Sequence, residues 1–218
     1  MDEVTALPRQ KPLLRGVSHE GAALVALGAG SVLVALAPPA HARLASAVYS
    51  LTLVAMFAVS ALYHRPAWGV RARTWMRRLD HSTIFLLIAG TFTPFAMLAL
   101  EGRERMQLLA FAWGGAALGV LQALFWVGAP RLLTALLYLA LGWGVLPSLE
   151  ALYPQLGVAG LLLLGGGGLA YSVGAVVYAL KRPDPVPRIF GYHEVFHALV
   201  IVASVLHFAA VLRLVRGP

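Results

Sequence analysis

The chain has 218 residues, of which 60% are hydrophobic and only 12% carry a charge, and its mean hydropathy is positive. These values exclude an ordinary water-soluble globular domain and indicate an integral membrane protein. The formal net charge of +8 requires no nucleic acid as a partner, because arginines beside anionic lipid headgroups account for it and the sequence holds no nucleic-acid-binding motif.

Seven apolar runs follow one another, each close to the roughly 20 residues that cross a ~30 Å hydrocarbon core. They cover residues 21–38, 46–64, 81–100, 107–127, 132–150, 157–180 and 193–213. The joints between them are too short for a soluble domain, and the absence of period-two alternation disfavours a β-barrel. We therefore predict an all-α protein, with a seven-transmembrane-helix bundle over residues 21–218 and an N-terminal arm over residues 1–20.

The distribution of Lys and Arg predicts the orientation of this bundle. If the N-terminus is cytoplasmic, twelve of the 17 basic residues lie on the cytoplasmic side and five on the other. Positive residues are enriched inside. The sequence thus predicts a multi-pass protein of the cell membrane with a cytoplasmic N-terminus and an external C-terminus.

Residues 1–42 also allow an alternative interpretation as a cleaved signal peptide. They combine a basic start, an apolar middle and "AHA" at 40–42, which resembles a cleavage site. The acidic residues Asp2, Glu3 and Glu20 and an apolar run of nearly full spanning length favour a retained first helix. The absence of cysteine excludes disulfides and thiolate metal sites.

Four ionisable residues interrupt the apolar pattern near one predicted membrane face. His64 ends the second run, Asp80 precedes the third, and His193 and His197 begin the seventh. On the seven-helix topology all four lie at the cytoplasmic ends of their helices. Ionisable groups at membrane depth are costly and usually functional, so we predict a functional site in this layer.

The spacing of these histidines predicts a metal site. His193 and His197 are four residues apart and project from one helical face about one turn apart. His64 would be a third imidazole ligand of a zinc ion, which leaves the fourth tetrahedral position for water, as in catalytic zinc sites. Ser60, on the face of His64, and Asp80 would orient an imidazole or that water. The alternative is a packed or interfacial histidine pair without metal.

Three other histidines are predicted to lie outside the ligand set. His207 follows His197 by ten residues, about 15 Å along a helix, and is expected to pack in the outer half of the bundle. His19 and His81 lie near the same inner interface, where either could neighbour the site, and contact with lipid headgroups is the favoured interpretation.

Several segments resemble those of a known family. "SALYH" at 60–64, "LDHSTIFLLIAGTFTPF" at 79–95 and "HEVFHALVIVASVLHF" at 193–208 are similar to the three signature segments of the haemolysin III family, and "LLRGVSHE" at 13–20 resembles its N-terminal segment. That family is the bacterial arm of the progestin and adiponectin receptor superfamily. The resemblance spans almost the whole chain.

The resemblance implies a seven-helix bundle with zinc near the cytoplasmic face. The family's zinc ligands correspond to His64, His193 and His197, its motif serine to Ser60, and its motif aspartate, which contacts the zinc-bound water, to Asp80. The wider superfamily and the alkaline ceramidases imply hydrolysis of lipid amides, whereas the family name implies membrane lysis.

"HEVFH" also satisfies the pattern His-Glu-x-x-His, in which the glutamate is the general base of a zinc protease. Glu194 is therefore a candidate base. Position 203, where the extended pattern places a third histidine, is Ala203. A coincidental match is the favoured interpretation, with Glu194 facing Arg188 or headgroups at the interface.

The mechanism predicted from these residues is zinc-assisted hydrolysis. The metal would lower the pKa of its water to ~7, Asp80 would orient that water or take its proton, and the carbonyl of a lipid amide or ester would approach from the bundle interior. Two alternatives lack turnover: a zinc-containing lipid sensor or homeostasis protein that binds a fatty acid, and a pore-forming cytolysin. Membrane lipids are the expected partners in every case.

Overall fold

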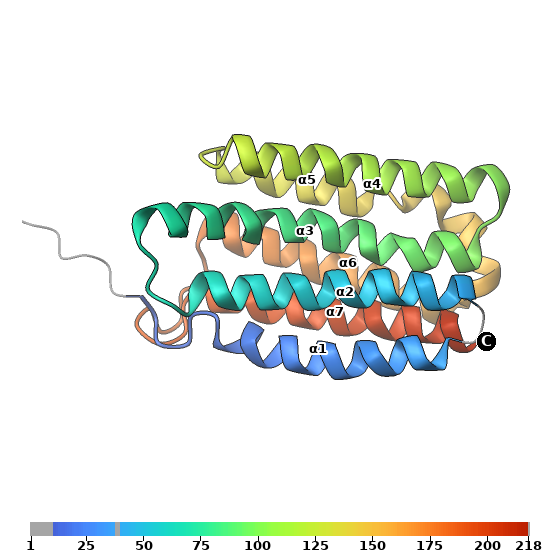
Figure 1. Cartoon of the computed structure of the whole chain (residues 1–218), viewed down its shortest axis with the longest axis horizontal. Coiled ribbons are helices and arrows are strands. Elements are labelled where there is room, and N and C mark those ends of the chain that lie inside the picture. Colours follow the sequence, from blue (N-terminus) through green and yellow to red (C-terminus); the bar gives the residue numbers. More distant parts are fainter. Residues whose placement is uncertain (1–10, 38–39, 218) are drawn as a thin grey trace, which may run out of the picture.

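A computed structural model describes residues 11–37 and 40–217 (Figure 1). These residues form the helices α1 (Val17–Leu36), α2 (Ala40–His64), α3 (Val70–Ala99), α4 (Gly102–Phe125), α5 (Arg131–Trp143), the short 3-10 helix η1 (Leu146–Ser148), α6 (Leu149–Leu180) and α7 (Tyr192–Arg216). The described residues contain one isolated β-bridge, between Val186 and Phe190. The predicted all-α class is confirmed.

Six helical stretches in the described ranges are long and apolar enough to cross a membrane. Five of them are single helices, namely α1, α2, α3, α4 and α7, and the sixth is the continuous stretch Arg131–Leu180. The prediction of seven separate spans is therefore met only in part. In place of the predicted run 132–150, α5 has 13 residues, or about 20 Å of helix, which is less than the thickness of the hydrocarbon core.

The stretch from α5 to α6 is bent at two places for local reasons. Pro147 lies in η1, where its missing N–H interrupts the α-helical hydrogen bonds. Gly157 has φ 60° and ψ −176°, a conformation that is open almost exclusively to glycine. Beyond this kink, α6 runs back along α5 (Figure 1).

Helix α3 begins at Val70, well before the predicted run 81–100. Its first turns are rich in arginine, and the hydropathy pattern placed them in a polar joint. Arginine is a good helix former, so these turns extend the helix beyond its apolar part. Asp80 consequently lies about three turns inside α3 rather than at its start.

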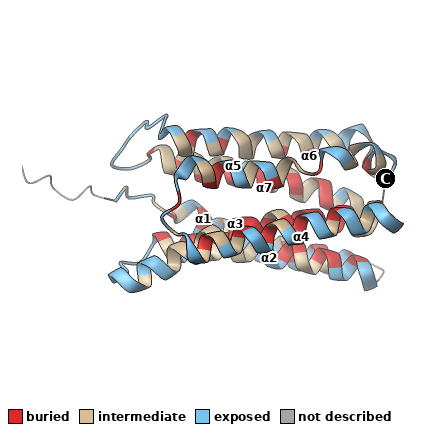
Figure 2. Cartoon of the chain, turned by 90° about the horizontal axis from the view of Figure 1, so that it is seen from above, coloured by how far each residue is buried: buried red, intermediate tan, exposed pale blue. Residues whose placement is uncertain are grey.

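The helices pack as an antiparallel bundle in which α1 contacts α2, α2 contacts α3, α3 contacts α4, and α6 contacts α7. Helix α7 also contacts α1, α2 and α3, which closes the bundle around α3, the most buried of the long helices (Figure 2). Large apolar side chains such as Leu51, Leu118 and Leu162 are instead exposed on the outside. An apolar exterior around a packed interior is the pattern of a protein surrounded by lipid.

Residues 11–16, 65–69, 126–130 and 181–191 lie at one end of the bundle, which we call the arm end (Figure 1). The C-terminus lies at the opposite end. Because α2 ends at the arm end and α7 begins there, the last residue of α2 comes close to the first turns of α7.

Candidate metal centre and its cavity

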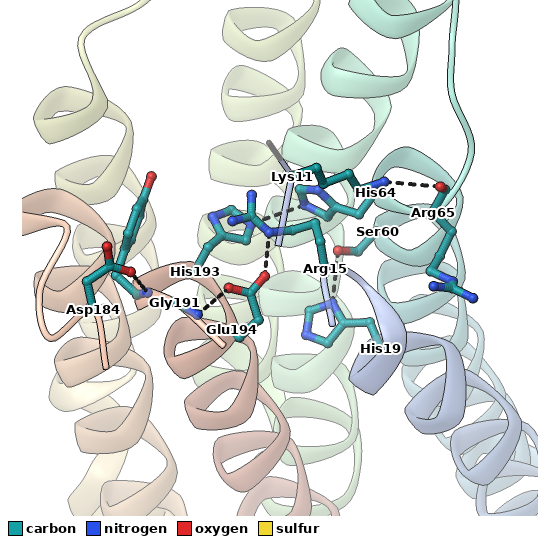
Figure 3. Close-up of polar contacts among 11 residues, drawn as sticks. Lys11, Arg15, His19, Ser60, His64, Arg65, Asp184, Gly191, His193 and Glu194 are labelled. Atoms are coloured by element: carbon teal, nitrogen blue, oxygen red, sulfur yellow. Dashed lines mark hydrogen bonds and ion pairs between the residues drawn. The ribbon is translucent and has the colours of Figure 1, made fainter. Parts of the chain in front are cut away.

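Three histidines meet at the arm end. His64 is the last residue of α2, and His193 and His197 lie in the first two turns of α7. One ring nitrogen of each lies within 4.8 Å of the other two, and the Nε2 atoms of His64 and His193 are 3.1 Å apart (Figure 3). His64 is 8% and His197 1% exposed. The structure thus brings together the three side chains that the sequence singled out.

The three imidazoles form a group that can hold a metal ion. Two ligands of a tetrahedral zinc site, each about 2.05 Å from the metal, lie about 3.3 Å apart, which is close to the 3.1 Å between the two Nε2 atoms. Nδ1 of His197 is buried and has no hydrogen-bond partner in the described part of the chain. A buried polar atom without a partner is costly unless something else satisfies it, and a metal bound by the histidines is one such group.

The start of α7 is fixed by Glu194, which is 2% exposed. Its Oε2 accepts a hydrogen bond of 2.8 Å from the backbone N–H of Gly191, which caps the helix. Its Oε1 pairs with Nε of Arg15 (Figure 3). The expectation that Glu194 faces Arg188 or headgroups is therefore wrong. Both carboxylate oxygens are occupied by structural contacts, which gives Glu194 a role in holding the first turn of α7, where His193 lies.

The described part of the N-terminal arm, residues 11–16, lies against this end of the bundle. The backbone N–H groups of Leu13 and Leu14 donate to the carbonyls of Arg188 and Ile189, and the Lys11 ammonium donates to the carbonyl of Arg65 over 3.0 Å. These contacts join the arm to the α6–α7 loop and to the end of α2. The arm is thereby tied to both helices that supply the histidines.

Gly16 brings the arm into contact with His64. It caps α1 with φ 82°, and a Cβ added there would lie 2.7 Å from Cβ of His64. Any other residue at this position would adopt a strained backbone and also push against His64. The close approach of α1 to α2 therefore depends on this glycine.

His19 neighbours the site, which was the less favoured of its two interpretations from the sequence. It is 2% exposed, so it does not contact headgroups. Its ring stacks on that of His197, with centroids 3.7 Å apart and planes 10° apart, and its Nδ1 lies 2.9 Å from Oγ of Ser60 (Figure 3). Ser60 thus contacts His19 rather than a ligand histidine. The available signal was the location of His19 in "LLRGVSHE", beside the first apolar run.

Replacing His19 by Ala is expected to weaken zinc binding by about 10- to 100-fold, the usual effect of losing a group that orients a metal ligand. The stacked ring of His19 holds the plane of His197, and alanine removes that support. Zinc affinity is measured by competition with a chelator, and the spectrum of the cobalt-substituted protein reports the geometry. His19→Phe keeps a stacking ring and is expected to lose less. Wild-type affinity and an unchanged cobalt spectrum in His19→Ala would contradict this role.

A cavity of about 1700 Å³ opens beside the three histidines. It is larger than the roughly 300–1,000 Å³ of most small-molecule pockets. Asp80 and Ser60 line it near the histidines, as does His81, whose carbonyl accepts a hydrogen bond from the Tyr138 hydroxyl. Asp80 thus lines the same cavity as the three histidines, on the wall formed by α3.

The cavity continues into the apolar interior as far as His207. His207 lies about 15 Å along α7 from His197, or roughly half of a ~30 Å hydrocarbon core. Its Nε2 lies 3.0 Å from the carbonyl of Leu164, so this ring is satisfied by packing, as predicted. The depth and the lining suit an extended apolar chain.

Comparisons with known proteins agree with this arrangement. Residues 8–208 match the family described as Haemolysin-III related. The chain is 30% identical over 206 residues to Hemolysin-3 of Bacillus cereus, which covers 93% of this chain and 91% of that protein. It is 32% identical over 165 residues to the Hemolysin-3 homolog of Bacillus subtilis (strain 168), covering 76% and 74%.

A plant protein extends the relationship beyond bacteria. The chain is 33% identical over 184 residues to the heptahelical transmembrane protein ADIPOR2 of Oryza sativa subsp. japonica, which covers 75% of this chain and 79% of that protein. A multi-pass membrane protein with these relatives and these apolar helices is expected in the plasma membrane. The chain belongs to the haemolysin III family, within the progestin and adiponectin receptor superfamily.

Proposed function

We propose that this protein is a zinc-dependent hydrolase that cleaves an amide or ester bond of a lipid inside the membrane. The observation that carries the proposal is the position of His64, His193 and His197 at the mouth of a cavity that continues to His207. A metal centre open to an apolar chamber suits a substrate with a polar carbonyl group and a long apolar chain. The plant relative is named a heptahelical transmembrane protein, ADIPOR2, and this name assigns no reaction.

Each residue of the site has a distinct task in this proposal. The three imidazoles hold zinc, which supplies Lewis-acid activation of water and of a carbonyl group. Asp80 accepts the proton of the attacking water at its carboxylate and returns it to the leaving nitrogen or oxygen. His19 and Ser60 keep the ring of His197 in place. The apolar wall between Leu87 and His207 holds the acyl chain and excludes bulk water.

An Asp80→Asn variant tests the hydrolase. It is expected to bind zinc normally and to lose about 10²- to 10⁴-fold in turnover of the lipid that the wild type cleaves, the usual contribution of a general acid–base group. The candidate substrates are a long-chain ceramide, its phosphate and the matched esters. The wild type and the variant are assayed in detergent micelles, with zinc content measured on the same samples. Asp184→Asn is the matched control, since Asp184 also lines the cavity but accepts a hydrogen bond from the backbone of Tyr192.

Two results would contradict the hydrolase assignment in different ways. Equal turnover in the wild type and Asp80→Asn would remove Asp80 from the chemistry. No turnover of any lipid amide or ester by the zinc-loaded protein would leave a lipid sensor without hydrolysis as the surviving interpretation.

We also propose that the chain crosses the membrane seven times, with the arm end in the cytoplasm. The excess of Lys and Arg in the N-terminal and alternate joints supports this orientation, and α5, η1 and the first turns of α6 together are long enough for one further crossing. Because the chain lacks cysteine, Ala67→Cys and Arg103→Cys give single labelling sites. A membrane-impermeant maleimide on intact cells is expected to label Arg103→Cys, and Ala67→Cys only after permeabilisation. The opposite pattern would invert the topology.

A further inference from the structure

The cavity wall at the arm end is strongly cationic. Eight Lys and Arg residues line the cavity, against two carboxylates, Asp80 and Asp184. Burial, together with the charges of Arg15, Arg65 and Arg73, lowers the pKa of Lys11, which is the effect expected where like charges accumulate. A lipid with an uncharged polar group would not require this accumulation of positive charge.

Several of these charges have partners of their own. Arg15 pairs with Glu194, and Arg65 pairs with Glu20 over 2.9 Å. Neither Arg77 nor Arg131 lies within 4.0 Å of a carboxylate among residues 11–37 and 40–217. These two guanidinium groups therefore remain available to a ligand.

Arg77 and Arg131 approach one region of the cavity from different helices. Arg77 is half-buried on α3, one turn before Asp80, and Arg131 is the first residue of α5. Both lie close enough to His81 and Tyr178 to act on them electrostatically. The Arg131 guanidinium also lies over the Tyr178 ring, 5.6 Å from its centroid. Two cations and a phenol, which donates one hydrogen bond, therefore surround this part of the wall.

This arrangement differs from the general enrichment of arginine at the inner membrane face. Arg71, on the same helix as Arg77, is exposed and does not line the cavity. Headgroup contact alone accounts for such a residue. It does not account for a half-buried arginine that lines a chamber together with Asp80.

We propose that Arg77, Arg131 and Tyr178 form a binding site for the anionic group of the lipid that occupies the cavity, so that the substrate is an anionic amphiphile. The inference rests on the proposed function, in which the acyl chain extends toward His207. A phosphate or carboxylate would contact the two guanidinium groups beside the three histidines, because the ring of Tyr178 lies 5.8 Å from that of His193 between their centroids. The scissile carbonyl then lies between the anionic group and the chain. This geometry selects against a lipid whose polar end is neutral.

Binding of three probes to the zinc-loaded protein in nonionic micelles tests the proposal by calorimetry. They are a monoacylglycerol phosphate, the monoacylglycerol with the same chain, and inorganic phosphate. The lipid phosphate is expected to bind at least about 10-fold more tightly than the neutral lipid, since each hydrogen bond to a charged group is worth about 10- to 100-fold. Added salt should reduce the difference. Inorganic phosphate is expected not to compete at micromolar concentration.

Variants assign the effect to the two arginines. Arg77→Gln and Arg131→Gln are each expected to weaken binding of the lipid phosphate by about 10-fold or more and to leave binding of the neutral lipid unchanged. Arg71→Gln, the matched control on α3, is expected to bind all probes as the wild type does. The same series in a His64→Ala background removes direct binding of phosphate to zinc, and the preference for the anionic lipid should persist there.

Equal affinity for the anionic and neutral lipids, or equal losses in Arg71→Gln and Arg77→Gln, would overturn the proposal. Competition by inorganic phosphate as strong as that of the lipid would also overturn it, because the site would then take a soluble anion. Hydrolysis of neutral lipids without any preference for the anionic probe would refute this site and leave the hydrolase intact. A preference that persists without turnover of any lipid would refute the hydrolase and leave this site.

Discussion

The His64→Ala variant is expected to lose most of its zinc, from about one ion per chain to well below one, after dialysis against a weak chelator. Three protein ligands are the usual number in an open zinc site, and this substitution removes the only ligand that α2 contributes. The two remaining imidazoles lie on a single helix. Elemental analysis of the purified protein measures the zinc content.

A second buried histidine supplies the control for this experiment. His207 is also 8% exposed, but its Nε2 contacts the carbonyl of Leu164 and it lies far from the three-histidine cluster. His207→Ala should therefore keep the zinc content of the wild type, although it removes a buried ring from the same cavity. Full zinc content in His64→Ala would remove the proposed third ligand.

The second large effect is expected at the ion pair between the N-terminal arm and α7. Arg15→Ala should lower the free energy of unfolding by about 3–5 kcal/mol, because it leaves a buried carboxylate without its partner. Glu194→Gln should lower the free energy of unfolding by less than Arg15→Ala does. The glutamine amide oxygen can still cap α7, and the Arg15 that loses its partner is 18% exposed, whereas Glu194 is 2% exposed. Unfolding in mixed micelles measures both values.

The double variant Arg15→Ala/Glu194→Gln shows how much of the loss in Arg15→Ala comes from the unpaired charge of Glu194. It should be more stable than Arg15→Ala alone, since no unpaired buried charge remains. Glu194→Gln also tests the protease-like pattern, since a structural Glu194 predicts that turnover per bound zinc is retained. Complete loss of turnover in a folded, zinc-containing Glu194→Gln would make Glu194 the base after all.

Local periodicity explains which parts of the site could be predicted. His193 and His197 share a helical face by their spacing alone, and apolar run length placed His64 at the end of a helix at the same depth. Helical spacing and membrane depth likewise indicated Ser60 and Asp80, and the resemblance to the haemolysin III family implied the same two residues. Long-range pairing was not accessible in this way: Arg15 and Glu194 are 179 positions apart, and no pattern in either neighbourhood indicates the other.

The errors in the predicted helices have a common physical origin. Hydropathy reports compatibility with lipid, whereas helix formation also depends on backbone propensity. Arginine-rich turns therefore extended α3 to Val70 without adding an apolar signal. The predicted run 132–150 was, by contrast, longer than the helix, because α5 ends at Trp143. Glycine and proline interrupt a helix there without making the segment polar, so hydropathy gives no sign of the end.

The position of the three histidines along the chain has a consequence for biosynthesis. Two of them lie in α7, which follows α1 to α6 in the chain, whereas His19 lies in α1 and Arg15 just before it. A nascent chain that has inserted α1 to α6 therefore holds only one of the three imidazoles. If the three histidines bind a metal as proposed, all three are available to it only after α7 has been synthesised, so metal occupancy would distinguish molecules that contain a folded α7 from earlier intermediates in the membrane.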